Sequence, residues 1–216
     1  MYQTILFDLD GTLTESGIGI VNSVIYALQK YGMEVTDREE LKRFIGPPLD
    51  KSFEQYCGFD SEKAKEAVEY YREYYREKGI FENIPYKGVA EMLKLLKDNG
   101  RTLIVATSKP EPFAKEILDY FKLSHYFDAI AGSNMDGTRT DKQEVIRYAL
   151  TKAGDGGTAS AIMVGDREHD IIGARAVGID SLGVLYGYGS REELVKAGAI
   201  YLAENVEEAA AILLKK

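Results

Sequence analysis

The chain has 216 residues, of which 45% are hydrophobic and 29% charged, a balance typical of a folded globular protein. Its 35 acidic and 27 basic residues give a formal net charge of -8, which argues against a nucleic-acid polymer as a partner. No apolar stretch approaches the roughly 20 residues that span a bilayer, and no signal sequence is visible, so we expect a cytoplasmic protein without a membrane partner.

The first expected element is a buried strand at residues 5–7, which ends at Asp8-Leu9-Asp10-Gly11-Thr12. Ligands of open α/β sheets bind at the carboxyl ends of strands, so Asp8 and Asp10 are placed for chemistry. No adjacent Lys or Arg neutralises them, and two like charges so close need a cation or a proton between them. Mg²⁺ fits, because it takes carboxylate and phosphate oxygens. The alternative is that both residues only cap a helix.

The next seventy residues predict helices. We expect a helix at 18–28, one opened by a capping box of Thr36 and Glu39 and ending near residue 45, and two more at 49–57 and 61–78, the last opened by Ser61. This helical block interrupts the chain directly after the first strand. We therefore expect an inserted helical cap domain at 15–83 and a core domain formed by 1–14 and 84–216.

Helices and strands alternate from residue 86 onward. We expect helices near 88–99, 111–121, 141–153, 169–177 and 191–197, with a final helix from Asn205, and strands at 102–107, 128–131, 160–165, 181–185 and 200–202. Such alternation predicts βαβ units with a parallel sheet. The expected fold class is therefore α/β, with a Rossmann-like core.

Three later strands also end in polar clusters. Thr107 and Ser108 precede a helix and could bind a phosphate oxygen, although Ser108 could simply cap that helix. Lys142 stands at a helix start, where a cation opposes the helix dipole, which suggests an anionic partner unless it is a surface lysine. Asp166 and Asp170 lie one helical turn apart and can face one point. Together with the first cluster, they predict one site at the edge of the sheet.

In this order the clusters resemble the four motifs of the haloacid dehalogenase-like (HAD) hydrolase superfamily. Residues 8–12 resemble the first motif, Thr107 the second, Lys142 the third and residues 165–170 the fourth. The helical insert resembles the C1 cap of subfamily I. Residues 10–20, 44–49, 107–110 and 185–190 further resemble the phosphoglycolate phosphatase-like branch and its HAD-type 5′-nucleotidases.

The resemblance implies a role for each matching residue. Asp8 would be the nucleophile that forms an aspartyl-phosphate, and Asp10 the general acid and base. The ligands of Mg²⁺ would be Asp8, the backbone carbonyl of Asp10 and Asp166, with Asp170 acting directly or through water. Thr107, Ser108 and Lys142 would bind the transferred phosphoryl group.

The function that follows is a Mg²⁺-dependent phosphomonoester hydrolase acting on a small phosphorylated metabolite, with a 5′-nucleotide or phosphoglycolate as substrate. The alternative is a β-phosphoglucomutase-like isomerase. Dehalogenation is disfavoured, because Asp10 would then have no leaving alkoxide to protonate. In the cap, Arg43 and Lys51 are candidates for substrate contacts, and Lys109 could also approach the site. We expect a monomer or a weak homodimer.

Overall fold

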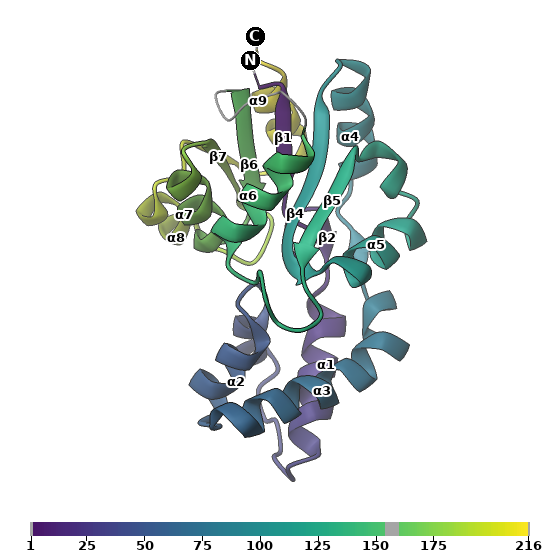
Figure 1. Cartoon of the computed structure of the whole chain (residues 1–216), viewed down its shortest axis with the longest axis vertical. Helices are drawn as coiled ribbons and strands as arrows, with labels where there is room; N and C mark the ends of the chain where they lie inside the picture. Colours follow the sequence, from purple (N-terminus) through teal and green to yellow (C-terminus); the bar gives the residue numbers. More distant parts are fainter. Residues whose placement is uncertain (1, 154–159, 216) are drawn as a thin grey trace. The chain divides into compact units, whose positions relative to one another are not determined.

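The computed structural model describes residues 2–153 and 160–215. It divides into two compact units, shown in Figure 1. The core unit comprises Met1–Thr14 and Pro85–Lys216, and the inserted unit comprises Glu15–Ile84. The chain passes between them in two short paired strands, β2 (Thr14–Glu15) and β3 (Ile84–Pro85). No helix in the described ranges is long and apolar enough to cross a membrane.

The core unit is built on a parallel sheet whose described strands follow the order β5-β4-β1-β6-β7-β8 (Figure 1). The strands are β1 (Thr4–Phe7), β4 (Thr102–Pro110), β5 (Ala129–Ser133), β6 (Ala161–Gly165), β7 (Asp180–Val184) and β8 (Tyr201–Ala203). After β1 the chain forms β4 and β5 on one side of β1, and it then forms β6, β7 and β8 on the other side. This reversal beside β1 is the switch point at which such sheets bind ligands. The expected α/β fold is confirmed.

Helices cover the sheet. They are α4 (Val89–Asp98), α5 (Glu111–Tyr120), α6 (Lys142–Lys152), α7 (Glu168–Val177), α8 (Arg191–Ala197) and α9 (Val206–Leu214), with a short 3-10 turn, η3 (Ser124–Tyr126). Helices α6 and α7 pack together and against β4, β5, β6 and β7, whereas α4 and α9 pack against each other and contact β4, β7 and β8. The side chain of Asn205 caps α9 by accepting a hydrogen bond from the Glu208 amide at 2.9 Å, as expected.

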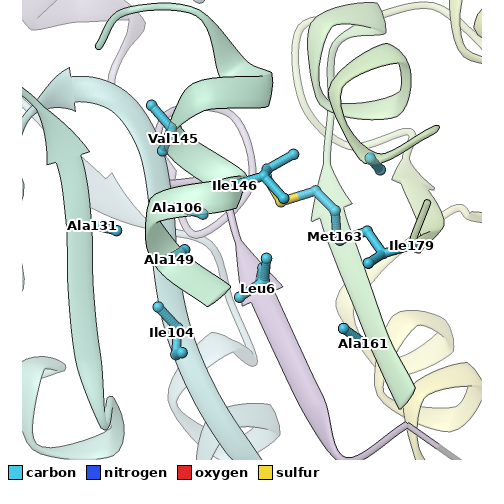
Figure 2. Close-up of a cluster of buried hydrophobic side chains, with 11 residues drawn as sticks. Leu6, Ile104, Ala106, Ala131, Val145, Ile146, Ala149, Ala161, Met163 and Ile179 are labelled. Atoms are coloured by element: carbon cyan, nitrogen blue, oxygen red, sulfur yellow. The ribbon is translucent and has the colours of Figure 1, made fainter. Parts of the chain in front are cut away.

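The face of the sheet beneath α6 forms a compact apolar cluster (Figure 2). Leu6, Ile104 and Met163 come from the three adjacent strands β1, β4 and β6 and are fully buried with Val145 and Ile146 of α6. The neighbours of Leu6 along β1 are buried as well, although successive strand residues point to opposite faces. A sheet buried on both faces explains why its strands are apolar runs rather than alternating patterns.

The inserted unit is helical, with α1 (Gly17–Gln29), η1 (Glu39–Phe44), α2 (Leu49–Cys57), α3 (Ser61–Glu77) and η2 (Gly79–Phe81). One expected helix start was wrong. Residues 39–44 form a 3-10 helix without the Thr36–Glu39 capping box, because the Asp37 carboxylate accepts from the Glu39 amide at 2.8 Å in a local turn. Helix α3 begins at Ser61, as expected, and its cap is Asp60, whose carboxylate accepts from the Lys63 amide at 2.9 Å.

Candidate active site

A tight turn at the end of β1 sets the position of the first two aspartates. The Asp8 amide still donates to the Val164 carbonyl of β6 at 2.9 Å, which continues the strand pairing by one residue. The amides of residues 12, 13 and 14 then all approach the Leu9 carbonyl at 2.9 to 3.3 Å, so the chain folds back on itself. Gly11 occupies the left-handed region with φ 81°, which this turn requires. Asp8 and Asp10 are thus held at the sheet edge by the backbone.

Three carboxylates meet beside the end of β1. Asp8 follows β1, Asp166 follows β6, and Asp170 lies in the first turn of α7. One oxygen of each lies within 4.8 Å of the others, and all three residues are buried. The structure therefore brings together the aspartates expected from the first and fourth polar clusters.

Burial of these carboxylates makes their negative charge unfavourable. Burial raises the pKa of Asp8 to about 6, with Asp170 adding to the shift and Lys142 opposing it. Burial, reinforced by the charges of Asp170 and Asp8, also holds the pKa of Asp166 well above its ordinary value. Crowded buried carboxylates of this kind favour either a proton or a cation between them.

Lys142 supplies one positive charge to the cluster. It is the first residue of α6, and its Nζ lies 2.9 Å from Asp8 Oδ1 and 2.8 Å from Asp170 Oδ1. Burial alone would lower the pKa of Lys142, but attraction by Asp170 and Asp8 outweighs it and raises the pKa. The side chain of Asp141 caps the same helix. The anionic partners that the position of Lys142 suggested are therefore present.

Asp166 is held by a contact from each of two loops. Its Oδ1 lies 3.3 Å from the Thr12 hydroxyl, and its Oδ2 accepts from the Tyr188 amide at 2.8 Å. Two glycines leave the necessary space: a Cβ at Gly11 would lie 2.2 Å from Asp166 Oδ2, and one at Gly187 would lie 2.4 Å from Asp166 Cβ. The Thr12 hydroxyl and the Tyr188 amide belong to loops far apart in sequence, and no sequence pattern predicted that either would contact Asp166.

Asp10 has a different environment from the other aspartates. Its Oδ2 lies 2.9 Å from Lys109 Nζ, and only 6% of the lysine side chain and 13% of the aspartate side chain are exposed. Its Oδ1 is buried and has no hydrogen-bond partner among residues 2–153 and 160–215. Lys109, expected only as a residue that could approach the site, thus contacts Asp10 directly.

The hydroxyl cluster lies within β4, which extends through Pro110 instead of ending at Thr107. Thr107 is buried, and its hydroxyl accepts from the Lys109 amide at 3.2 Å. Ser108 is half-buried and does not cap α5, whose N-cap is Pro110 without a side-chain hydrogen bond. The alternative that Ser108 caps the following helix is therefore wrong.

Arg43 and Lys51 belong to the inserted unit. Both are exposed, with the Arg43 guanidinium carbon 4.4 Å from the centroid of the Tyr56 ring and Lys51 Nζ 2.9 Å from Glu54 Oε2. These contacts occur within the inserted unit, so the expected substrate role of both residues stays a prediction.

The donor set suits a hard divalent cation. Asp8 and Asp166 offer carboxylate oxygens at one point, where burial raises the pKa of both groups, and a divalent cation there would favour their charged forms. Carboxylates beside buried lysines, at the switch point of a parallel sheet, form a site that can carry out phosphoryl transfer.

Comparison with known proteins agrees with this class of site. The model of the haloacid dehalogenase-like hydrolase family matches residues 5–184. A 5′-nucleotidase of Pseudomonas aeruginosa is 48% identical over 193 residues, which cover 89% of this chain and 87% of that protein. The tyrosine-protein kinase PtkA of Mycobacterium tuberculosis is 39% identical over 194 residues, covering 90% of this chain and 66% of that protein.

Among solved structures, a predicted phosphatase from Clostridium acetobutylicum superposes with a TM-score of 0.96 at 50% identity, and the match covers 99% of each chain. The fold and the site define an α/β protein whose parallel sheet carries a centre of buried carboxylates at its edge. The chain belongs to the haloacid dehalogenase-like hydrolase family, and within it is a phosphatase.

Proposed function

We propose that this phosphatase is a Mg²⁺-dependent phosphomonoester hydrolase that acts through an aspartyl-phosphate on Asp8. The observation that carries the proposal is the convergence of three buried aspartates and Lys142 at the end of β1. Cation-rich surroundings stabilise the charge of a transferring phosphoryl group, which is the main requirement of this chemistry.

Two aspartates would divide the covalent chemistry between them. An Asp8 oxygen forms a bond to phosphorus while the bond from phosphorus to the leaving oxygen breaks, and Asp10 gives that oxygen a proton. Water then forms a bond to phosphorus, the bond to Asp8 breaks, and the proton of the water goes to Asp10. The spacing of one residue between Asp8 and Asp10 places both carboxylates at the same turn.

Asp8, the Asp10 backbone carbonyl and Asp166 would hold the magnesium ion. When bound, it neutralises part of the negative charge that the carboxylates and the phosphoryl group bring together. Asp170 Oδ1 lies 2.8 Å from Lys142 Nζ, and its Oδ2 accepts from the Arg167 amide at 3.1 Å. We propose that Asp170 supports the metal directly or through water.

Thr107, Ser108 and Lys142 would bind the equatorial oxygens of the phosphoryl group. Lys142 is well placed for this because its Nζ already contacts the proposed nucleophile. The Thr107 hydroxyl lies in the strand next to β1 and can donate a hydrogen bond when it binds an anion.

The inserted unit, Glu15–Ile84, would act as a cap that excludes water and selects the leaving group. Arg43 and Lys51 are exposed cations of that unit and remain our candidates for contacts with the substrate. Double substitution to Met should raise KM for the best substrate more than it lowers kcat.

The similarity to a 5′-nucleotidase makes nucleoside 5′-monophosphates the first substrates to test, with phosphoglycolate second. An isomerase related to β-phosphoglucomutase would use the same two aspartates but return the phosphoryl group to a sugar. A relative named as a tyrosine kinase adds transfer from ATP to tyrosine as a third activity to test.

A phosphate-release screen with Mg²⁺ or EDTA tests the proposal, using nucleoside monophosphates, phosphoglycolate, sugar phosphates and pyrophosphate. Asp8→Asn is the inactive variant, and the exposed carboxylate Asp98→Asn is its control. We expect Mg²⁺-dependent release that Asp8→Asn abolishes and Asp98→Asn retains. A phosphorylated isomer without released phosphate, or phosphotyrosine formed from ATP, would contradict the proposal.

A further inference from the structure

The contact between Lys109 and Asp10 is separate from the cluster of Asp8, Asp166, Asp170 and Lys142. Lys109 Nζ lies 2.9 Å from Asp10 Oδ2 in a nearly enclosed position, since both side chains are at most 13% exposed. An ion pair that is shielded from solvent restricts the conformations of its two side chains more than an exposed pair does. The orientation of the Asp10 carboxylate therefore depends on Lys109.

The two oxygens of Asp10 are unequal. Oδ2 has the lysine, whereas Oδ1 is buried without a hydrogen-bond partner in the described part of the chain. A buried carboxylate oxygen without a partner is unfavourable unless something else completes its contacts. The reacting oxygen of a substrate or of water is a group that Asp10 would have to meet under the proposed function.

The backbone around Lys109 is held by its neighbours. Its amide donates to the Thr107 hydroxyl at 3.2 Å, within the part of β4 where the pairing with β5 shifts register. Its carbonyl lies so close to Gly132 that a Cβ there would come within 2.7 Å of it. The irregular end of β4 thus fixes the backbone position from which the Lys109 side chain extends to Asp10.

We infer that Lys109 is a positioning residue for Asp10: its ammonium group holds Oδ2 and so presents Oδ1 to the leaving-group oxygen. This inference rests on the proposed function. As the bond from phosphorus to the leaving oxygen breaks and the bond to Asp8 forms, the proton on Asp10 Oδ1 goes to that oxygen. Without Lys109 the carboxyl group can rotate away, and misplaced catalytic groups lose rate steeply.

The inference predicts a loss that depends on the leaving group. A nucleoside leaves as a basic alkoxide and needs a proton, whereas p-nitrophenolate is stable as an anion and needs little help. The parameter to compare is kcat/KM, since it includes steps only through departure of the leaving group. The turnover number, kcat, also includes hydrolysis of the aspartyl-phosphate. Asp10 acts in that step with either substrate, so kcat does not distinguish the two leaving groups.

The test compares Lys109→Met, Lys109→Arg and wild type with a nucleoside 5′-monophosphate and with p-nitrophenyl phosphate. For Lys109→Met we expect kcat/KM to fall about 10- to 100-fold with the nucleotide and less than about 3-fold with the aryl ester. Lys109→Arg keeps a cation and should recover part of the loss. Lys97→Met, which removes a surface ion pair with Asp128 at 2.8 Å, is the control and should change neither value.

Inhibition by inorganic phosphate separates positioning from direct binding. The inhibition constant should be unchanged in Lys109→Met, because Lys109 acts on Asp10 and not on the phosphoryl group. Equal losses with both substrates, together with weaker inhibition by phosphate, would overturn the inference and make Lys109 a phosphate ligand. If wild type released phosphate from neither substrate, the proposed function itself would fail.

Discussion

The Lys142 ammonium group lies 2.9 Å from Asp8 Oδ1, and only 6% of the lysine side chain is exposed. The same nitrogen reaches Asp170 Oδ1 at 2.8 Å. One buried cation therefore joins the carboxyl end of β1 to the first turn of α7, and it balances two carboxylates whose burial is unfavourable. Stability and activity should both depend on this contact.

Replacing Lys142 with Met should lower the free energy of unfolding in EDTA by about 3 kcal/mol, because it leaves two buried carboxylates without their cation. Urea denaturation measures this loss, and phosphate release should fall with it. The exposed pair Lys97–Asp128 provides the comparison, since Lys97→Met should cost less than about 1 kcal/mol. Equal losses in the two variants would mean that burial adds nothing to the Lys142 contact.

Asp166→Asn should make the metal-free protein more stable while it removes the response to metal. Asp166 is fully buried beside Asp8 and Asp170, so an uncharged amide relieves repulsion, with an expected gain of about 1 kcal/mol or 2 to 4 °C. Thermal unfolding in EDTA and in excess Mg²⁺ checks both effects. Wild type should be stabilised by Mg²⁺, because a ligand that binds only the folded state raises its stability. A Mg²⁺ shift in Asp166→Asn equal to that of wild type would refute a ligand role for Asp166.

Gly187→Ala should disrupt the site by steric overlap alone. Its Cβ would lie 2.3 Å from the Gly11 carbonyl oxygen and 2.4 Å from Asp166 Cβ, so the loop that bonds Asp166 must move. The rate of phosphate release should fall at least about 10-fold, since small displacements are costly at such sites. The rise in melting temperature that Mg²⁺ induces should fall by more than half. Gly100→Ala is the matched control, because nothing lies within 4 Å of its Cβ. Its φ of 74° should cost about 1 kcal/mol of stability and leave activity intact. Activity lost equally in both variants would point to general destabilisation.

From the sequence, we could predict that polar clusters directly after strands meet at one edge of the sheet. Asp8, Lys142, Asp166 and Asp170 come together because parallel strands end at one edge, and this rule needs no knowledge of side-chain packing. The contact of Lys109 with Asp10 was harder to predict. It depends on β4 continuing through Pro110 with a register shift, whereas the apolar pattern alone indicates a strand end at Thr107.

Other features depend on contacts that a local pattern does not contain. Thr12 and Tyr188 meet Asp166 across 154 and 22 residues of chain, and ordinary turn sequences surround both. The Thr36–Glu39 pattern matched a capping box, but the nearer Asp37 side chain took the Glu39 amide. Local competition of this kind is decided by geometry that residue spacing alone does not specify.

A pH-dependent contribution to stability is expected from Glu193. Its Oε1 accepts from the Arg167 side chain at 2.8 Å and from the Glu168 amide at 2.9 Å. Partial burial tends to raise the pKa of Glu193, but these bonds outweigh it and hold the pKa below the ordinary value of 4.5. A lowered carboxyl pKa stabilises the folded state above the unfolded pKa, and the effect disappears as pH falls through the folded value.

Glu193→Gln should therefore cost about 1 kcal/mol near neutral pH, and the difference from wild type should shrink as the pH falls below 4.5. Urea denaturation at several pH values measures this. Glu192→Gln, an exposed neighbour, controls for the change in net charge. A difference that stays constant down to the acid limit would show that the Glu193 charge makes no contribution.

The most direct test of the account is the covalent state of Asp8 during turnover. Enzyme mixed with excess substrate and Mg²⁺, quenched in acid within the first turnover and digested, should yield a peptide whose Asp8 carries a phosphoryl group, identified by mass spectrometry. Asp8→Asn should give no such peptide and no released phosphate. Phosphate released at the normal rate by Asp8→Asn, or a phosphoryl group trapped on another residue, would contradict the central claim.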